Sequence, residues 1–177
     1  TAGGDREVLG VDIGDSEDET FWTRFLRSLK DRGLGGVRLV ISDAHAGLKA
    51  AIRKCFTGSS WQRCRVHYAR NLLANVPRAH QEMVAAAFRS VFALTTTADV
   101  EARWDEVTNT LEERFPKAAD SMREARTDVL AFAVFPRDHW KKIWSNNPLE
   151  RLNKEVKRRA DVVGIFPNEA AITRLVG

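Results

Sequence analysis

The 177-residue sequence predicts an α/β protein with a large helical insertion, and three observations lead to this fold class. Short aliphatic runs alternate with amphipathic stretches in the first third of the chain, in the order expected of a sheet with parallel neighbouring strands. The middle, residues 77–144, has helical periodicity and no convincing strand up to residue 127. A basic stretch that begins with helix-capping residues then predicts a further helix.

The first elements are assigned from composition and spacing. Residues 6–13, REVLGVDI, are rich in aliphatic and β-branched side chains and predict a strand. A helix follows, for which Ser16 and the acidic residues after it are the start signal and Gly33 the stop. This helix carries one apolar stripe: Phe21, Trp22, Phe25, Leu26 and Leu29. Residues 37–42, VRLVIS, form a nearly continuous apolar run, as expected for a strand buried on both faces.

The remaining elements are mostly helical. Residues 43–56 predict a helix, and SWQRCRVHY, 60–68, predicts a short strand that leads into the next helical stretch. The insertion carries two stripes at helical spacing: Val84, Ala87, Phe88, Val91 and Phe92, then Val100, Trp104, Val107, Leu111 and Phe115. Residues 129–135, VLAFAVF, are ambiguous between strand and helix.

The bulk composition excludes several classes of protein. A content of 44% hydrophobic and 29% charged residues is ordinary for a soluble globular domain. The sequence has neither an apolar run long enough to span a membrane nor a signal peptide at its start. Cys55 and Cys64 are too few for a disulfide framework and favour a reducing cytoplasm. A net charge of +4 admits a nucleic-acid partner without establishing one.

Asp43 has two interpretations. It follows the apolar strand 37–42, so that Ser42 or Asp43 could serve as the N-cap of the next helix. Ligand sites of open α/β sheets also collect at the carboxyl ends of strands, where a carboxylate can reach a divalent ion.

Glu150 also has two interpretations. With Asn147 as N-cap and Pro148 as the first helical residue, Glu150 would complete a capping box. At helical spacing it also shares one side of the helix with cations, next to an apolar side made by Leu149, Leu152 and Val156. The stretch holds five cations that face only Glu150 and Glu155: Arg151, Lys154, Lys157, Arg158 and Arg159. A carboxylate followed by such cations suits a metal held beside DNA phosphates, and a solvated charged face is the alternative.

Two other patterns carry less weight. Cys64 and His67 have a C-x2-H spacing, but a structural zinc site requires four ligands and the sequence offers no second paired spacing. Asp12, in VDIGDSED, is similar to the phosphate loop of actin-like phosphotransferases, whose glycine-rich partner loop is missing here.

Long ordered phrases of this sequence resemble the bacterial Mutator-type transposases over essentially the whole chain: REVLGVDIGDSED, VRLVISDAHAGLKAAI, WQRCRVHYARNLL and IWSNNPLERLNKEVKRRADVVGIFP. The resemblance implies a ribonuclease-H-like core with an Asp-Asp-Glu triad and a helical insertion before the glutamate. It divides the chain into an α/β part of the core (1–76), the insertion (77–144) and C-terminal core helices that carry the glutamate (145–177).

By matching positions, the resemblance assigns Asp43 as the second aspartate and Glu150 as the glutamate, both as metal ligands. Cys64 and His67 match a C-x2-H motif that supports the active site, and the signature around the glutamate takes in three further residues: Asn147, Arg151 and Asn153. In the family the first aspartate lies on the first strand, ahead of two further strands and the first helix. A helix follows Asp12 directly, so the resemblance does not assign Asp12 as the first aspartate. On this resemblance the chain is truncated at both ends and begins after the first aspartate, so its own activity stays open.

The implied chemistry is metal-dependent DNA cleavage and strand transfer, with Mg²⁺ or Mn²⁺ as cofactor. The expected partners are double-stranded DNA, at transposon inverted repeats and target sites, and further copies of the protein in a homodimer or larger assembly. A bacterial cytoplasmic, nucleoid-associated location follows. The alternatives are a non-catalytic DNA-binding or interaction remnant, which would bind DNA without metal dependence, and an actin-like phosphotransferase that depends on Asp12.

Overall fold

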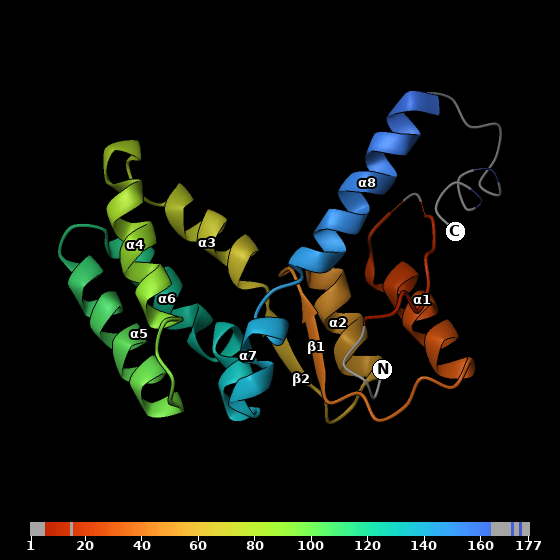
Figure 1. Cartoon of the computed structure of the whole chain (residues 1–177), viewed down its shortest axis with the longest axis horizontal. Coiled ribbons are helices and arrows are strands. Elements are labelled where there is room, and N and C mark those ends of the chain that lie inside the picture. The colour runs from red at the N-terminus through yellow and green to blue at the C-terminus, as the bar shows by residue number, and fades with distance from the viewer. Residues whose placement is uncertain (1–5, 15, 164–170, 172–173, 175–177) are drawn as a thin grey trace. The chain divides into compact units, whose positions relative to one another are not determined.

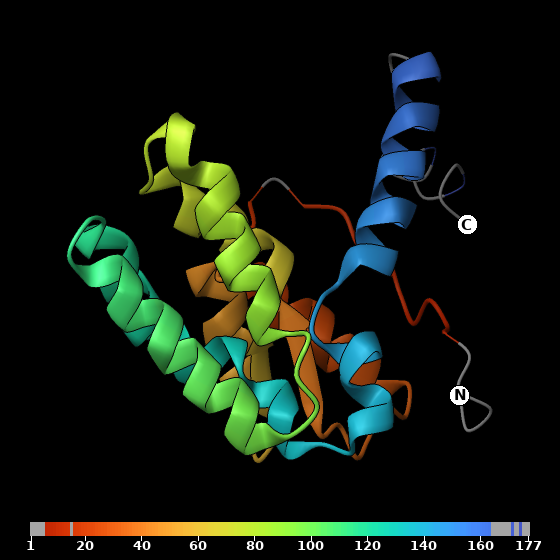
Figure 2. The ribbon, with the colours of Figure 1, turned by 60° about the vertical axis from the view of Figure 1, so that its left-hand side comes forward.

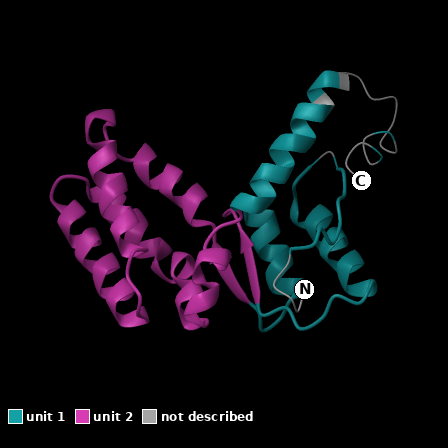
Figure 3. Cartoon of the chain, viewed as in Figure 1, with its two compact units in different colours: residues 1–38, 45–59, 147–177 teal, residues 39–44, 60–146 magenta. Residues whose placement is uncertain are grey.

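The computed structural model describes residues 6–14, 16–163, 171 and 174 (Figure 1). Its helices and strands, in chain order, are α1 Glu19–Asp31, β1 Leu39–Ser42, α2 Ala46–Cys55, β2 Ser60–Arg63, α3 Arg65–Ala74, α4 Gln81–Val91, α5 Thr97–Glu112, α6 Pro116–Val129, α7 Arg137–Ile143 and α8 Asn147–Val163. They form two compact units (Figure 3). Unit 1 comprises residues 1–38, 45–59 and 147–177, and unit 2 comprises residues 39–44 and 60–146. The predicted ITRLVG helix end falls almost entirely outside the described residues.

Among the described residues the sheet has two strands. β1 and β2 are parallel, with Leu39 opposite Ser60 and Ser42 opposite Arg63. This confirms the predicted parallel neighbours, although β1 is mostly half-buried rather than buried on both faces. The predicted strand at 6–13 is wrong, because these residues form neither strand nor helix. Val8, at 60% exposure, and its neighbours lack the pairing that turns a strand-forming sequence into a strand.

The helix α1 of unit 1 is defined by its two caps. The N-cap is Asp18, whose carboxylate accepts a 2.8 Å hydrogen bond from the Phe21 amide, so the start signal predicted at Ser16 was two residues early. Gly33 ends the helix as predicted, with φ +100°. The amides of Gly33 and Leu34 donate back to the carbonyls of Lys30 and Leu29, the pattern of a Schellman cap.

The helices α1 and α2 pack closely because Gly47 has no side chain. A Cβ atom at Gly47 would lie 2.7 Å from the backbone nitrogen of Glu19. Around this approach, Lys30 Nζ donates to the Cys55 carbonyl at 3.0 Å, and Lys54 lies 3.5 Å from the Glu19 carboxylate. Cys55 is a buried free thiol within this contact.

Unit 2 holds the larger core. Its buried side chains come from α3 through α7, including Tyr68, Phe88, Trp104, Met122 and Phe132. The predicted strand at 60–68 is correct only as far as Arg63, because α3 already begins at Arg65. The buried side chains of this stretch recur every four residues, at Cys64, Tyr68 and Leu72. This helical spacing of buried residues outweighs the β-propensity of the side chains.

The predicted insertion, residues 77–144, is helical throughout its described elements. Most members of the two predicted stripes lie in helices, α4 and α5, and are buried, while Phe92 and Phe115 are buried just beyond the ends of these helices. The ambiguous segment 129–135 ends α6 and forms a 3₁₀ turn, Ala131–Val134. Gln62 of β2 secures this turn to the sheet: its amide donates to the Val129 carbonyl and accepts from the Phe132 amide, each at 2.7 Å.

None of the helices in the described part of the chain combines the length and the apolar character needed to cross a membrane.

Candidate functional site

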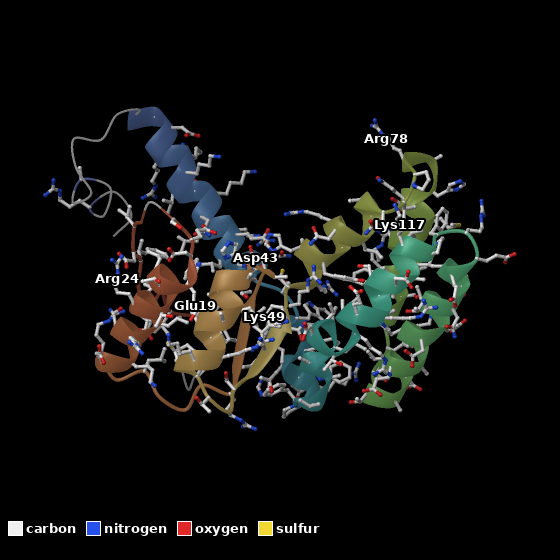
Figure 4. The ribbon with its side chains drawn as sticks, turned by 180° about the vertical axis from the view of Figure 1, so that it is seen from behind. Glu19, Arg24, Asp43, Lys49, Arg78 and Lys117 are labelled. Carbon is white, nitrogen blue, oxygen red and sulfur yellow. The ribbon has the colours of Figure 1, made fainter. Side chains whose placement is uncertain are left out.

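Asp43 follows β1 directly, at the carboxyl end of the strand (Figure 4). Its side chain is half-buried. The N-cap of α2 is His45, so the prediction that Ser42 or Asp43 caps this helix was wrong by two to three residues. The Ser42 hydroxyl is used elsewhere: it donates to the Asp43 carbonyl at 2.7 Å and accepts from the Trp61 indole at 2.9 Å. The carboxylate of Asp43 therefore lies in a short connection between β1 and α2.

Cys64 and His67 lie at the start of α3, in the same unit as Asp43. Cys64 is fully buried at the N-cap position, and its Sγ lies within 4.8 Å of an imidazole nitrogen of His67, which is half-buried. The Cys64 amide donates to the Ser42 carbonyl at 2.7 Å, continuing the β1–β2 pairing by one residue. The C-x2-H motif thus links the first turn of α3 to the strand end that precedes Asp43.

Glu150 lies in the first turn of α8, in unit 1, and is half-buried. The helix already includes Asn147, so the prediction of Asn147 as N-cap and Pro148 as first helical residue was one residue late. An acidic side chain in the first turn is stabilised by the partial positive charge of the helix start. The predicted apolar side of α8 is confirmed: Leu149, Leu152 and Val156 line a hollow of about 450 Å³ together with Trp22 and Phe25.

The other side of α8 is basic and exposed. Its exposed cations are Arg151, Lys154, Lys157, Arg158 and Arg159. Two of them are partly neutralised, since Glu155 accepts hydrogen bonds from Arg158 at 2.8 Å and from Arg159 at 3.1 Å. These bonds lower the pKa of Glu155 to about 2, and the same contact raises the pKa of Arg158. Arg151, Lys154 and Lys157 are the remaining cations of this side.

Asp12, on which the phosphotransferase alternative depends, belongs to the segment before α1. Its carboxylate accepts a hydrogen bond from the neighbouring Ile13 amide at 2.9 Å and lies 3.4 Å from the Arg24 guanidinium. These two contacts stabilise the Asp12 carboxylate locally and give no support to a phosphate loop.

The sequence profile described as "Transposase, Mutator family" matches residues 1–177. The chain belongs to the Mutator family of transposases.

Curated relatives of this transposase chain agree with that assignment. It is 49% identical over 176 residues to the transposase for insertion sequence element IS1081 of Mycobacterium bovis. It is 40% identical over 179 residues to the transposase for IS256 in transposon Tn4001 of Staphylococcus aureus, and 39% identical over 173 residues to that for ISRM5 of Rhizobium meliloti. These matches cover 98–100% of the chain but only 42–46% of the relatives. The chain therefore spans less than half the length of the curated transposases it matches.

Within the transposase chain, the predicted site residues fall in two groups. Unit 2 holds Asp43, Cys64 and His67, which the β1–β2–α3 connections bring together. Unit 1 holds Glu150 and the basic side of α8. The sequence interpretation missed a third feature: residues 44–81 contain seven Lys and Arg and no Asp or Glu. A count of charges by segment would have found it.

Proposed function

We propose that this chain provides two carboxylates, Asp43 and Glu150, of the catalytic core of a transposase with a ribonuclease-H-like fold. The observation that carries the proposal is the family match over the whole chain, together with the two positions. One carboxylate follows a strand of a parallel pair and the other lies in the first turn of a helix with a basic side. Ligand sites of open α/β sheets collect at the carboxyl ends of strands, and a carboxylate in the first turn of a helix is stabilised by the partial positive charge of the helix start.

The donor chemistry of the two residues fits a hard divalent cation. Carboxylate oxygens are the protein ligands that Mg²⁺ and Mn²⁺ prefer, and both side chains are half-buried. When bound, such ions lower the pKa of an attacking water or 3′-hydroxyl and stabilise the leaving oxygen of the cleaved phosphodiester. Cys64 and His67 act as positioning residues, because their helix start is hydrogen-bonded to the strand that precedes Asp43.

The basic side of α8 binds the DNA backbone beside Glu150. Arg151, Lys154 and Lys157 supply charges that attract phosphates independently of sequence. The arginine guanidinium can grip a phosphate with two hydrogen bonds, whereas the lysines contribute point charges. In the whole transposase, this surface would hold the terminal inverted repeats and the target duplex, while the carboxylates would hold the metal ions beside the phosphodiester. Assembly as a homodimer or larger complex on DNA, and association with the nucleoid, belong to the same proposal.

The test uses a chimera, in which this chain replaces the matching segment of the IS1081 transposase, to supply the parts beyond the match. We expect Mg²⁺-dependent nicking of a labelled transposon-end duplex by the chimera. Asp43→Asn and Glu150→Gln should each abolish nicking and leave duplex binding in EDTA intact. Glu113→Gln, on the exposed end of α5, is the matched control and should nick normally.

A second measurement covers the case in which the chimera fails to fold. Mn²⁺ binding to the 177-residue chain alone is followed by electron paramagnetic resonance, with circular dichroism as the folding check. Weaker binding in the Asp43 and Glu150 variants, but not in the Glu113 variant, supports the proposal. Equal Mn²⁺ binding in all variants, together with DNA binding that ignores metal, would identify a non-catalytic DNA-binding remnant instead.

A further inference from the structure

Two hollows lie side by side on unit 2 and share Phe92. The first lies between α3 and α4 and has a volume of about 310 Å³. The second, of about 510 Å³, lies between the start of the α4–α5 connection and α7, which are adjacent in Figure 2. Because Phe92 borders both, the two hollows are neighbours within the unit, and they are called one surface below. The residues proposed above for catalysis and DNA binding line neither of them.

The lining of this surface is strongly cationic. Arg65, Arg70 and Arg89 line the first hollow, and Arg137 and Lys141 line the second. Asp138 is the one carboxylate among the lining residues of the two hollows. Glu82 is ion-paired with Arg89 at 2.8 Å from outside the lining, which leaves a clear excess of positive charge. Two of these cations, Arg65 and Arg70, lie in the stretch 44–81, which contains no acidic residue.

Aromatic side chains lie at the junction of the two hollows. The Arg65 guanidinium lies 3.9 Å from the centre of the Trp144 ring and 4.9 Å from that of Phe92. The Arg65 amide also donates to the Trp144 carbonyl at 3.0 Å, and Trp144 packs edge-on against Phe92 and Phe132. The half-buried Arg65 and Trp144 therefore form a fixed stack of a planar cation on an indole ring.

We propose that this surface of unit 2 binds an unpaired DNA strand. Phosphates would lie along the five cations, and bases would stack on the Arg65–Trp144 pair at the junction. An unpaired strand fits better than a duplex, because the surface is concave and partly apolar, and a duplex would present only its phosphates to it. The inference rests on the proposed function, since strand cleavage at a transposon end leaves a free 3′ end that must be held until transfer.

The test measures fluorescence anisotropy of a labelled oligothymidine and of a duplex of equal length, both in EDTA. The double variant Arg137→Gln with Lys141→Gln should lower oligothymidine affinity at least tenfold. It should also reduce the slope of log affinity against log salt concentration by about 1.4, because each phosphate contact on a single strand contributes about 0.7. Arg65→Lys keeps the charge and removes the planar stack, so affinity should fall with an unchanged salt slope. Arg78→Gln with Lys117→Gln, labelled in Figure 4, removes two cations of the same unit outside both hollows and should change affinity less than twofold.

Three results would overturn the inference: unchanged oligothymidine binding in the Arg137 and Lys141 variant, an equal loss in the Arg78 and Lys117 control, or displacement by polyglutamate as effective as by unlabelled oligothymidine. The last would indicate an acidic peptide as the partner. The outcome is independent of the metal site, because Asp43→Asn and Glu150→Gln should bind oligothymidine normally in EDTA. If nicking by the chimera depends on those two carboxylates but oligothymidine does not bind this surface, only the strand-binding inference is rejected. If oligothymidine binds this surface but nicking does not depend on the carboxylates, only the catalytic proposal is rejected.

Discussion

Tyr68 provides a direct test of the packing of unit 2, because it is the only tyrosine in the chain. Its ring is fully buried, with centroids 5.7 Å from Phe88 and 5.9 Å from Trp104. Burial raises the pKa of Tyr68 to about 12, against smaller opposing effects of the Ser121 hydroxyl and the Arg63 guanidinium. The tyrosinate form is therefore disfavoured in the folded chain.

The pKa difference predicts the direction and size of a pH effect on stability. An unfolded tyrosine has a pKa of about 10, so between pH 10 and about 12 the unfolded chain has released a proton that the folded chain retains. The free energy of unfolding must then fall as the pH rises through this window, whereas below pH 10 the contribution is fully present. Two pK units at about 1.4 kcal/mol each correspond to a loss of about 3 kcal/mol.

The assay is a spectrophotometric titration of tyrosinate absorbance, combined with urea unfolding at several alkaline pH values. We expect ionisation near pH 12, or at the pH of unfolding if that comes first, and a decline in stability that is absent in Tyr68→Phe. The phenylalanine variant is a close control, since the hydroxyl's contact with the Ser121 hydroxyl is a long one, at 3.4 Å. Ionisation near pH 10 in a chain whose circular dichroism stays native would refute the burial of Tyr68.

Three further predictions concern single side chains. Gln62→Leu should lower the free energy of unfolding by about 2–6 kcal/mol, measured by urea denaturation, because it leaves the buried Val129 carbonyl and Phe132 amide without their partner. Gln62→Glu, which keeps one acceptor, is the comparison; a change below about 1 kcal/mol for leucine would contradict the bonding described. Lys154→Gln should weaken duplex binding equally for all sequences and reduce the salt slope by about 1, whereas a sequence-dependent loss would argue against a phosphate contact. Glu155→Gln removes the carboxylate that pairs with two arginines of α8 and should strengthen duplex binding at low salt; weaker binding would mean that Glu155 positions those arginines for DNA.

The sequence predicted elements best where an apolar stripe persists over several turns. The α4 and α5 stripes were predicted, because a helix with one buried face repeats apolar residues every three to four positions over its whole length. Short segments were less predictable: residues 6–13 and 64–68 both favour strands by composition. Whether such a segment becomes a strand depends on the presence of a partner strand. Tyr68 joins a helix instead, because it is buried on the same helical face as Cys64 and Leu72, each about one turn away.

The candidate site was predicted as residues rather than as a geometry. Asp43 and Glu150 were identified at a strand end and a helix start, and both positions hold apart from shifts of one to three residues in the caps. Such shifts are expected, because several consecutive polar residues can cap a helix and only backbone geometry selects among them. The cationic surface around Arg65 was missed because its members come from three separate helices, which no periodicity in the sequence connects.

The contacts around Ser42 connect the start of α3, and with it Cys64, to the strand that precedes Asp43. The Ser42 carbonyl accepts from the Cys64 amide, and its hydroxyl joins the Trp61 indole to the Asp43 carbonyl. The backbone that carries Asp43 is therefore held on both sides by β2 and by the start of α3. Cys64 is completely buried at that point, so a larger or charged residue there would displace the helix start and the strand end together. The proposed role of Asp43 as a metal ligand requires such a fixed backbone, because cation affinity falls when its ligands must first be ordered. The burial of Cys64 at this junction supports the proposal that the C-x2-H motif positions Asp43.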